Sequence, residues 1–580
     1  MKPRTERSDA PFAGTPSRHR LGVMTAAPRT PTSIDQIAEA WVDTLAELDP
    51  SLATYIGRSE HNERYADFSP EGHERLDEAR RVTLAALEAA SPADVVDEVT
   101  KDDLTRELRL DLEIHEAKWH LRDLNVIASP AQDIRSVFDL MPTSTVDDWS
   151  VVSTRLKALP DAVDGYIATL REGIAEGVVP ARRQVSEVVT QIARYTSDSG
   201  FFASFAADAA PDDGQLPASL ARDLADSTNA ARVAYDALAS FLVAELAPAA
   251  NEQDAVGREL YAMHSRGFLG ATIDLDETYE WGIEELARMV AEQESIAHEI
   301  KPGASVEEAV AFLEQDPSRK LRGTDALQRW MQTTSDKAVE ELGRTHFDIP
   351  EPIRTLECMI APTNEGGIYY TGPTDDFSRP GRMWWSVPEG VEEFDTWREL
   401  TTVYHEGVPG HHLQIAQAVY NRAELNSWRR LLAGGSGHAE GWALYAERLM
   451  EQLGYLDDPA DRLGMLDGQR MRAARVVLDI GLHLSKPRPD GSGTWDFDYA
   501  LDFMQHNVNM PDEFIRFEVN RYAGWPGQAP AYKVGQRIWE QLRDEVAERE
   551  GADFSIKAFH KRALAIGGVG LDTLRTALVG

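Results

Sequence analysis

The chain has 580 residues, and 97 Asp and Glu against 59 Lys and Arg give it a formal net charge of −38 at pH 7. Binding to phosphates requires clustered positive charge, so this balance excludes a general affinity for nucleic acid or for an anionic membrane. Hydrophobic residues make up 42% and charged residues 27% of the chain, which is typical of a globular protein with a large core.

Cys358 is the single cysteine. One cysteine excludes an intramolecular disulfide and a thiolate cluster, so any bound metal must use His, Asp or Glu. No apolar run approaches the roughly 20 residues that span a bilayer, and the N-terminus lacks the apolar core of a signal peptide. We therefore predict a cytoplasmic protein that binds neither nucleic acid nor membrane. The sequence does not predict an oligomeric state.

Residues 1–33 are rich in Arg, Pro, Ser and Thr, which predicts a disordered tail. Met24 opens a fresh Ala/Pro/Thr stretch, so translation from Met1 and translation from Met24 are both compatible with this segment. From Ile34 onward, apolar residues recur at spacings of three and four, and the segments end at Gly, Pro or Ser/Asp. Residues 34–580 are therefore expected to form a large helical body with a deep central cleft. One possible arrangement has two lobes around that cleft.

Strand-like sequence lies between about 353 and 387, in IRTLECMIAP, GGIYYTGP and RMWWSV. These segments alternate or are rich in β-branched and aromatic residues. The predicted fold is therefore mainly α, with a small β-sheet just before the most polar motif of the chain.

That motif is HEGVPGHH at residues 405–412. Zinc hydrolases commonly carry H-E-x-x-H on a helix, where two histidines one turn apart bind the ion and the Glu acts as general base. Here Pro409 stands at the position of the second histidine. On a regular helix His411 would point about 120° away from His405, and His412 would lie about 10.5 Å along the axis, too far to share one ion.

Pro409 also suggests how the histidines can meet. It has no N–H to bond the carbonyl of His405, and Gly410 tolerates unusual dihedral angles. We therefore expect the helix to bulge or unwind at this point. A bulge that absorbs two residues would bring His405 and His411 to one ion, with Glu406 beside a bound water.

A third metal ligand is expected from another helix. The segment GHAEGWALYAERLME at 437–451 is strongly helical, and Glu440 lies in its first turn. Its small neighbours Ala439 and Gly441 permit close approach to another element. The alternative is an ordinary helix whose N-terminal acid interacts with the helix dipole.

Four segments together resemble the bacterial domain-of-unknown-function 885 family: HEGVPGHHLQ, AEGWALYAE, RVVLDIGLH and RYAGWPGQAPAYKVG. They occur in order, and the resemblance spans roughly Ile34 to the C-terminus. That family is similar to the gluzincin metallopeptidases, whose helical members include the angiotensin-converting-enzyme-like and oligopeptidase-like folds.

The resemblance implies a set of roles for the motif. By it, His405, His411 and Glu440 are the ligands of Zn²⁺, and Glu406 is the general base. His/His/Glu sites accept other divalent first-row ions as well. His412 ranks below His411 as a ligand, with a substrate contact or a supporting hydrogen bond as its other roles.

Further candidates lie on the segment 475–483. Arg475, Asp479 and His483 are spaced by four and share one helix face. Asp479 is a candidate to orient a ligating imidazole, because metal-bound histidines usually donate their other N–H to a carboxylate or carbonyl. The alternative is a buried, salt-bridged helix face.

The segment 521–535 reads as a loop within a helical region. The oxyanion of amide hydrolysis needs a donor besides the metal, and Tyr522 is the first candidate. Arg521 is a candidate to bind a substrate carboxylate, and Tyr532 and Lys533 are substitutes for either. The alternative is a turn that packs the final helices.

The resemblance extends to the small sheet and to the substrate. In helical gluzincins a sheet edge beside the active-site helix pairs with extended substrate, so Tyr369 and Tyr370 are expected to line the cleft. The predicted function is zinc-dependent hydrolysis of peptide bonds, with a peptide or a small amide as substrate. A zinc amidase or esterase acting on a small metabolite and a non-catalytic peptide-binding protein are the alternatives.

Overall fold

The computed structural model describes residues 29–212, 214–361 and 367–580. The protein is mainly α-helical, as the periodicity predicts. The helices of the first half of the chain are α1 (Ser33–Leu48), α2 (Pro50–Tyr55), α3 (Pro70–Ala89), α4 (Val95–Glu116), α5 (Pro130–Ser136), α6 (Val146–Glu176), α7 (Arg182–Thr196), α8 (Phe201–Ala207), α9 (Ala218–Phe241), α10 (Ala247–Ala249) and α11 (Arg258–Leu269).

The helices of the second half pack around one another. They are α12 (Leu275–Ile300), α13 (Val306–Leu313), α14 (Thr324–Thr345), α15 (Thr396–Glu406), α16 (His411–Tyr420), α17 (Ser427–Leu431), α18 (Ser436–Gln452), α19 (Pro459–His483), α20 (Phe497–Asn507), α21 (Asp512–Gly524), α22 (Ala531–Glu550), α23 (Ile556–Ala565) and α24 (Leu571–Val579).

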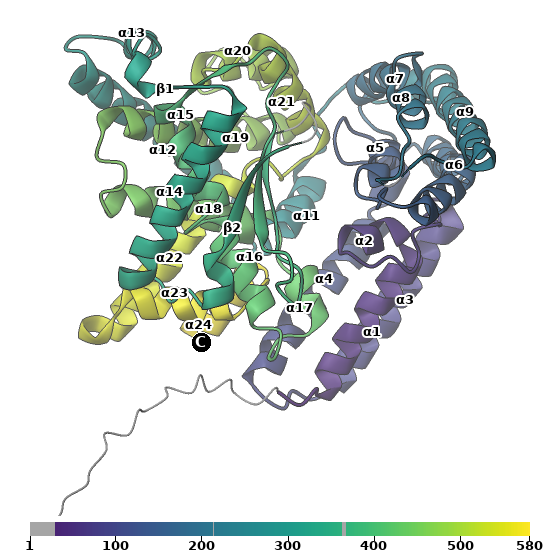
Figure 1. Ribbon diagram of the computed structural model, residues 1–580, viewed down its shortest axis with the longest axis horizontal. Helices are drawn as coiled ribbons and strands as arrows, with labels where there is room; N and C mark the ends of the chain where they lie inside the picture. Colours follow the sequence, from purple (N-terminus) through teal and green to yellow (C-terminus); the bar gives the residue numbers. More distant parts are fainter. Residues whose placement is uncertain (1–28, 213, 362–366) are drawn as a thin grey trace, which may run out of the picture.

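Buried apolar side chains form separate cores in the two halves. One core lies within residues 124–250, in α5 to α9, and the largest core joins α11, α12, α15, α16 and α18 to α24. Figure 1 shows α5 to α9 on one side of the molecule and α12 to α24 on the other. A deep cleft between two lobes stays a prediction.

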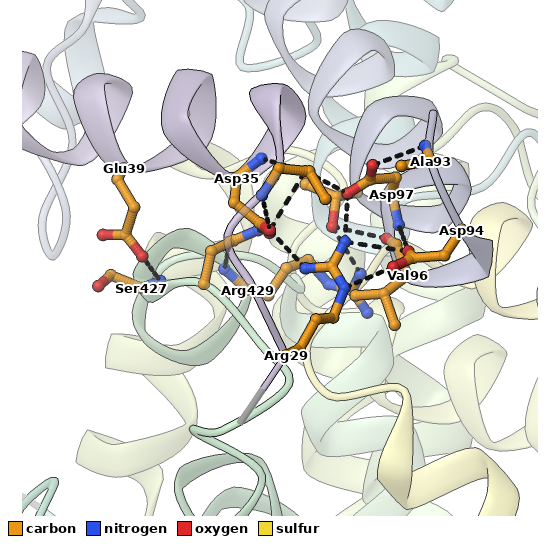
Figure 2. Close-up of polar contacts among 12 residues, drawn as sticks. Arg29, Asp35, Glu39, Ala93, Asp94, Val96, Asp97, Ser427 and Arg429 are labelled. Carbon is orange, nitrogen blue, oxygen red and sulfur yellow. Dashed lines mark hydrogen bonds and ion pairs between the residues drawn. The ribbon is translucent and has the colours of Figure 1, made fainter. Parts of the chain in front are cut away.

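The segment just before α1 contacts the rest of the protein. Residues 1–28 of the predicted disordered tail lie outside the described residues, and residues 29–33 are described. The Arg29 guanidinium forms ion pairs with three aspartates (Figure 2). The backbone amide of Arg29 donates to the carbonyl of Ala423 at 3.0 Å. The three partners are Asp35, Asp94 and Asp97. These contacts join the segment before α1 to α4 and to the loop before α17.

The predicted strands form a small sheet, and a second, smaller sheet was not predicted. β2 (Leu356–Ile360) pairs in parallel with β4 (Gly381–Trp385), and β3 (Ile368–Thr371) pairs antiparallel with β4, in the order β2-β4-β3. β1 (Lys320–Arg322) and β5 (Glu393–Asp395) form an antiparallel pair. The three-stranded sheet packs on α14 and on Val403 of α15, so it lies beside the helix that ends in the polar motif.

Candidate metal centre

The HEGVPGHH motif falls at a break between two helices. α15 ends at Glu406, and α16 begins at His411. Gly410 has to be glycine, because a Cβ there would lie 1.9 Å from the carbonyl oxygen of His405. The prediction that the helix unwinds at Pro409 is confirmed, although the result is a break between two helices rather than a bulge within one.

The break brings His405 and His411 together. Their rings meet nearly edge to face, with centroids 4.8 Å apart and an interplanar angle of 89°. Nε2 of His405 lies 3.3 Å, and Nε2 of His411 3.6 Å, from Oε2 of Glu440. The ligand atoms of these three residues all lie within 4.8 Å of one another, so the group can hold a metal ion.

Glu440 comes from α18, and small residues bring this helix close to its neighbours. A Cβ on Gly441 would lie 2.7 Å from the Cα of Gly535, so α18 and α22 approach each other closely at this point. The indole Nε1 of Trp442 donates to the carbonyl of Pro409 at 2.8 Å. The close approach that was predicted from Ala439 and Gly441 therefore exists, and α18 is tied directly to the helix break.

A carboxylate that was not predicted orients His405. Nδ1 of His405 lies 2.7 Å from Oε1 of Glu447, which lies two turns beyond Glu440 on α18. Asp479 was expected in this role, but its Oδ2 accepts from the hydroxyl of Tyr261 and from the amide of Gly527. Glu447 thus takes the position for which Asp479 was predicted.

Charge and burial act against each other at this site. Burial alone would lower the pKa of His405, but Glu440 and Glu447 raise it to about 10 in the metal-free protein. Burial would raise the pKa of Glu440, but the imidazoles of His405 and His411 hold it well below its usual range. The pKa of Glu406 is raised, chiefly by burial. The site therefore favours positive charge at its centre, as a cation site must.

Two carboxylate oxygens at the site are buried without a regular hydrogen bond. Oε2 of Glu406 has no partner among the described residues, and Oε2 of Glu440 faces only the imidazoles of His405 and His411, at 3.3 and 3.6 Å. Buried carboxylate oxygens without good donors are costly, and a bound cation and its water would supply what they lack. These two oxygens and the donor set therefore fit a divalent metal.

His412 is held away from the metal group. Its Nε2 donates to the carbonyl of Ile353 at 2.7 Å, and its Nδ1 accepts from the hydroxyl of Tyr370 at 2.9 Å. Burial lowers the pKa of His412 to about 4, so the ring is neutral. Both ring nitrogens are occupied, which leaves His411 as the candidate ligand and makes Tyr370 a support for α16.

Tyr522 and Arg521 belong to a buried ionic cluster centred on Glu518. Oε2 of Glu518 accepts from Nη2 of Arg475 at 2.7 Å and from the Tyr522 hydroxyl at 2.5 Å, and its Oε1 accepts from Arg521 at 3.1 Å. Arg475 also donates to the Tyr522 hydroxyl at 2.6 Å. The alternative of a packing cluster therefore describes Arg475, Arg521 and Tyr522 better than direct roles in the reaction.

Among the other predicted residues, Tyr532 has a pKa that the charge of Glu440 affects. Its pKa is raised first by burial and next by Glu440, and its hydroxyl has no hydrogen-bond partner in the described part of the chain. Lys533 is only 2% exposed and holds internal partners, and His483 donates to the carbonyl of Tyr522 at 2.9 Å. Tyr369 is 41% exposed on β3. The charge of Glu440 therefore acts on Tyr532, whereas Lys533 and His483 make structural contacts.

The protein is mainly helical and has a His/His/Glu group that can hold a metal. The model of the family described as bacterial protein of unknown function (DUF885) matches residues 50–578. The chain therefore belongs to this family. No curated protein matches the chain.

Two of the solved structures that match the chain share its fold. A protein described as a "putative lipoprotein" from Colwellia psychrerythraea is 22% identical, with a TM-score of 0.82, and the match covers 94% of this chain and 99% of that one. One from Shewanella oneidensis, described as a "putative lipoprotein of unknown function", is 17% identical with a TM-score of 0.72, over 95% and 100%. A carboxypeptidase from Pyrococcus furiosus matches with a TM-score of 0.42, 13% identity and coverage of 95% and 97%. Among the helices described, none combines the length and the apolar character needed to cross a bilayer.

Proposed function

We propose that the protein is a zinc-dependent hydrolase that cleaves peptide bonds. The observation that carries this proposal is the convergence of His405, His411 and Glu440 beside Glu406, whose Oε2 is buried without a partner. Two imidazoles and one carboxylate are the ligand set of catalytic zinc sites that keep one position open. A site for a structural ion would have no use for a further unpaired carboxylate.

Each side chain then has a defined task. When bound, the ion would polarise the scissile carbonyl and lower the pKa of a water molecule. Oε2 of Glu406 accepts the proton of the attacking water and returns it to the leaving amine. Its raised pKa brings the carboxyl closer to neutral pH, which suits a group that both takes and returns a proton.

Tyr532 replaces Tyr522 as the proposed donor to the oxyanion. The Tyr522 hydroxyl is 0% exposed and is held between Arg475 and Glu518. The Tyr532 hydroxyl has no hydrogen-bond partner among the described residues, and the charge of Glu440 raises its pKa, which supports a position near the metal group. A neutral phenol with a raised pKa keeps its proton and can donate it to a developing negative charge.

The small sheet favours a peptide over a small metabolite. β3 is an edge strand of the sheet in the order β2-β4-β3, and it packs against α15, which carries His405. An extended peptide can add to such an edge through its main chain. Tyr369, exposed on β3 and stacked on Trp384 at 6.2 Å, would then contact a substrate side chain.

The proposal is tested by screening the zinc-loaded protein and its Glu406→Gln variant against peptide libraries, small amides and esters. The variant is expected to keep zinc and lose turnover by a factor of about 10³ or more, because only the base is removed. Glu399→Gln, the same substitution two turns earlier on α15, is the control and should turn over like the wild type. Retained activity in Glu406→Gln, or turnover of small esters and not peptides, would refute the corresponding part of the proposal.

A further inference from the structure

A chain of buried hydrogen bonds leads away from the metal group. Oε1 of Glu447 is 2.7 Å from Nδ1 of His405, and Oε2 of Glu447 accepts from Nε2 of Gln469 at 3.0 Å. Oε1 of Gln469 in turn accepts from Nζ of Lys533 at 2.8 Å. Glu447, Gln469 and Lys533 are each at most 2% exposed. The chain thus runs from the metal ligand on α15 through α18 and α19 to α22.

The ammonium group at its far end sets the direction of every bond. Lys533 has three N–H donors and no acceptor. Besides Gln469, it donates to Oε1 of Gln536 at 2.9 Å and to Oε1 of Glu285 at 3.0 Å. Three donors therefore meet three acceptors. The amide oxygen of Gln469 must face Lys533, so the amide nitrogen must face Glu447.

The direction of the Gln469 amide also determines which atoms donate and accept between Glu447 and His405. Because Gln469 donates to Oε2 of Glu447, that carboxylate serves as an acceptor and Oε1 accepts the N–H of His405. Once His405 gives up the proton on Nε2, as a metal ligand must, its remaining proton lies on Nδ1 and the lone pair of Nε2 faces Glu440 and His411. If the Gln469 amide were flipped, its Oε1 would face Oε2 of Glu447 without a proton between them. The hydrogen bonds from Lys533 to His405 would then no longer run in one direction.

We propose that Gln469 and Lys533 are positioning residues that hold His405 in the tautomer and orientation that bind metal, by fixing the direction of the hydrogen bonds through Glu447. This inference rests on the proposed metal site. It gives Lys533 a role in metal affinity in place of the contact with substrate predicted from the sequence. Supporting groups around metal ligands typically contribute about 10- to 100-fold in metal affinity.

The chain offers a matched control for this inference. Gln536 also accepts from Lys533, at 2.9 Å, and is 2% exposed against 0% for Gln469, but it leads to Glu540 rather than to Glu447. Methionine has nearly the size of glutamine and forms neither hydrogen bond. Gln469→Met and Gln536→Met therefore remove the same kind of contact with Lys533, and only the first interrupts the path to His405.

The experiment measures the zinc dissociation constant of the full-length metal-free protein by competition with a chromophoric chelator, for the wild type and both variants. Thermal unfolding of each metal-free protein is followed in parallel. Gln469→Met is expected to weaken zinc binding about 10-fold or more, whereas Gln536→Met stays within about 2-fold of the wild type at a similar loss of Tm. Lys533→Met should weaken binding in the same direction, and adding it to Gln469→Met should have little further effect.

The outcomes separate this inference from the proposed function. If the wild type binds no zinc, the proposed function fails and the inference fails with it. If the wild type binds zinc and Gln469→Met binds it equally well, the inference alone is overturned. Equal weakening by Gln469→Met and Gln536→Met would also overturn it, because the effect would then follow from packing around Lys533.

Discussion

Two clusters of histidines in the described part of the chain differ in whether they can hold a metal. His73 of α3, His115 of α4 and His120 of the turn that follows lie together in the first half of the chain, with ring centroids of His115 and His120 4.2 Å apart and planes only 10° apart. At the metal group the rings of His405 and His411 stand at 89°. Parallel rings hold their nitrogens in separate planes, whereas perpendicular rings can direct them to one point.

The charges around the two histidine clusters also differ, as the pKa values of His73 and His405 show. Burial and the neighbouring His115 lower the pKa of His73 to about 4, whereas Glu440 and Glu447 raise the pKa of His405 to about 10 against the effect of burial. At His73 the first cluster therefore disfavours positive charge, whereas the second favours it at His405. Carboxylates also lie beside His115, with Oε1 of Glu74 3.3 Å and Oδ2 of Asp77 3.5 Å from its Nε2. What distinguishes the metal group is that its rings and the carboxylate of Glu440 converge on one point, not the number of histidines.

The largest effect that tests this comparison is the loss of metal. Glu440→Ala and His405→Ala should each weaken zinc binding by more than about 100-fold, because each removes one of three ligands. His115→Ala, in the other cluster, should leave zinc content unchanged. Elemental mass spectrometry of the purified proteins after equilibration with zinc measures all three. Zinc retained by Glu440→Ala, or lost by His115→Ala, would show that the ion binds elsewhere.

A smaller effect separates two tyrosines of the final helices. Tyr532→Phe should lower kcat on a peptide substrate on the order of 10²-fold with little change in KM, because it removes a donor that acts in the transition state. Tyr522→Phe should change kcat far less and instead lower Tm, because its hydroxyl binds Arg475 and Glu518 inside the protein. Steady-state kinetics and thermal unfolding of both variants decide between them. The reverse pattern would restore Tyr522 as the oxyanion donor.

The sequence predicts the metal ligands better than the groups that support them. His405, His411 and Glu440 stand in short motifs whose local chemistry is readable, and Pro409 signals the break that lets them meet. Glu447 was missed, although it follows Glu440 by seven residues, two helical turns, and so returns to the same face. That spacing was the signal that could have found it.

The errors arise where a contact depends on which helices are neighbours. Spacing places Asp479 and His483 on one face of α19, but it does not reveal that this face meets Tyr261 of α11, 218 residues earlier. The same holds for Gln469 and Lys533, which lie 64 residues apart. β1 and β5 were missed for a simpler reason, because three residues are too few to show an alternating pattern.

The smallest effect we predict concerns stability and pH in the first histidine cluster. The pKa of His73 is about 4 in the folded protein and about 6.5 when unfolded, so between these values the unfolded chain binds more protons. The free energy of unfolding must therefore fall as pH falls from about 6.5 toward 4, by on the order of 1–2 kcal/mol after allowance for solvent screening. His73→Gln removes this titration and should make the acid side of the stability profile less steep, while His120, His264 and other buried histidines with lowered pKa values keep their share of the slope.

Urea unfolding of the metal-free protein at pH 7 and at pH 5 measures this slope. His506→Gln is the control, because its side chain is 73% exposed on α20 and its removal should leave the slope as in the wild type. Equal slopes for the wild type and His73→Gln would mean that the stacked rings admit a proton without cost. The distinction between a cluster that excludes charge and one that attracts it would then rest on the ring directions and the carboxylates of the metal group alone.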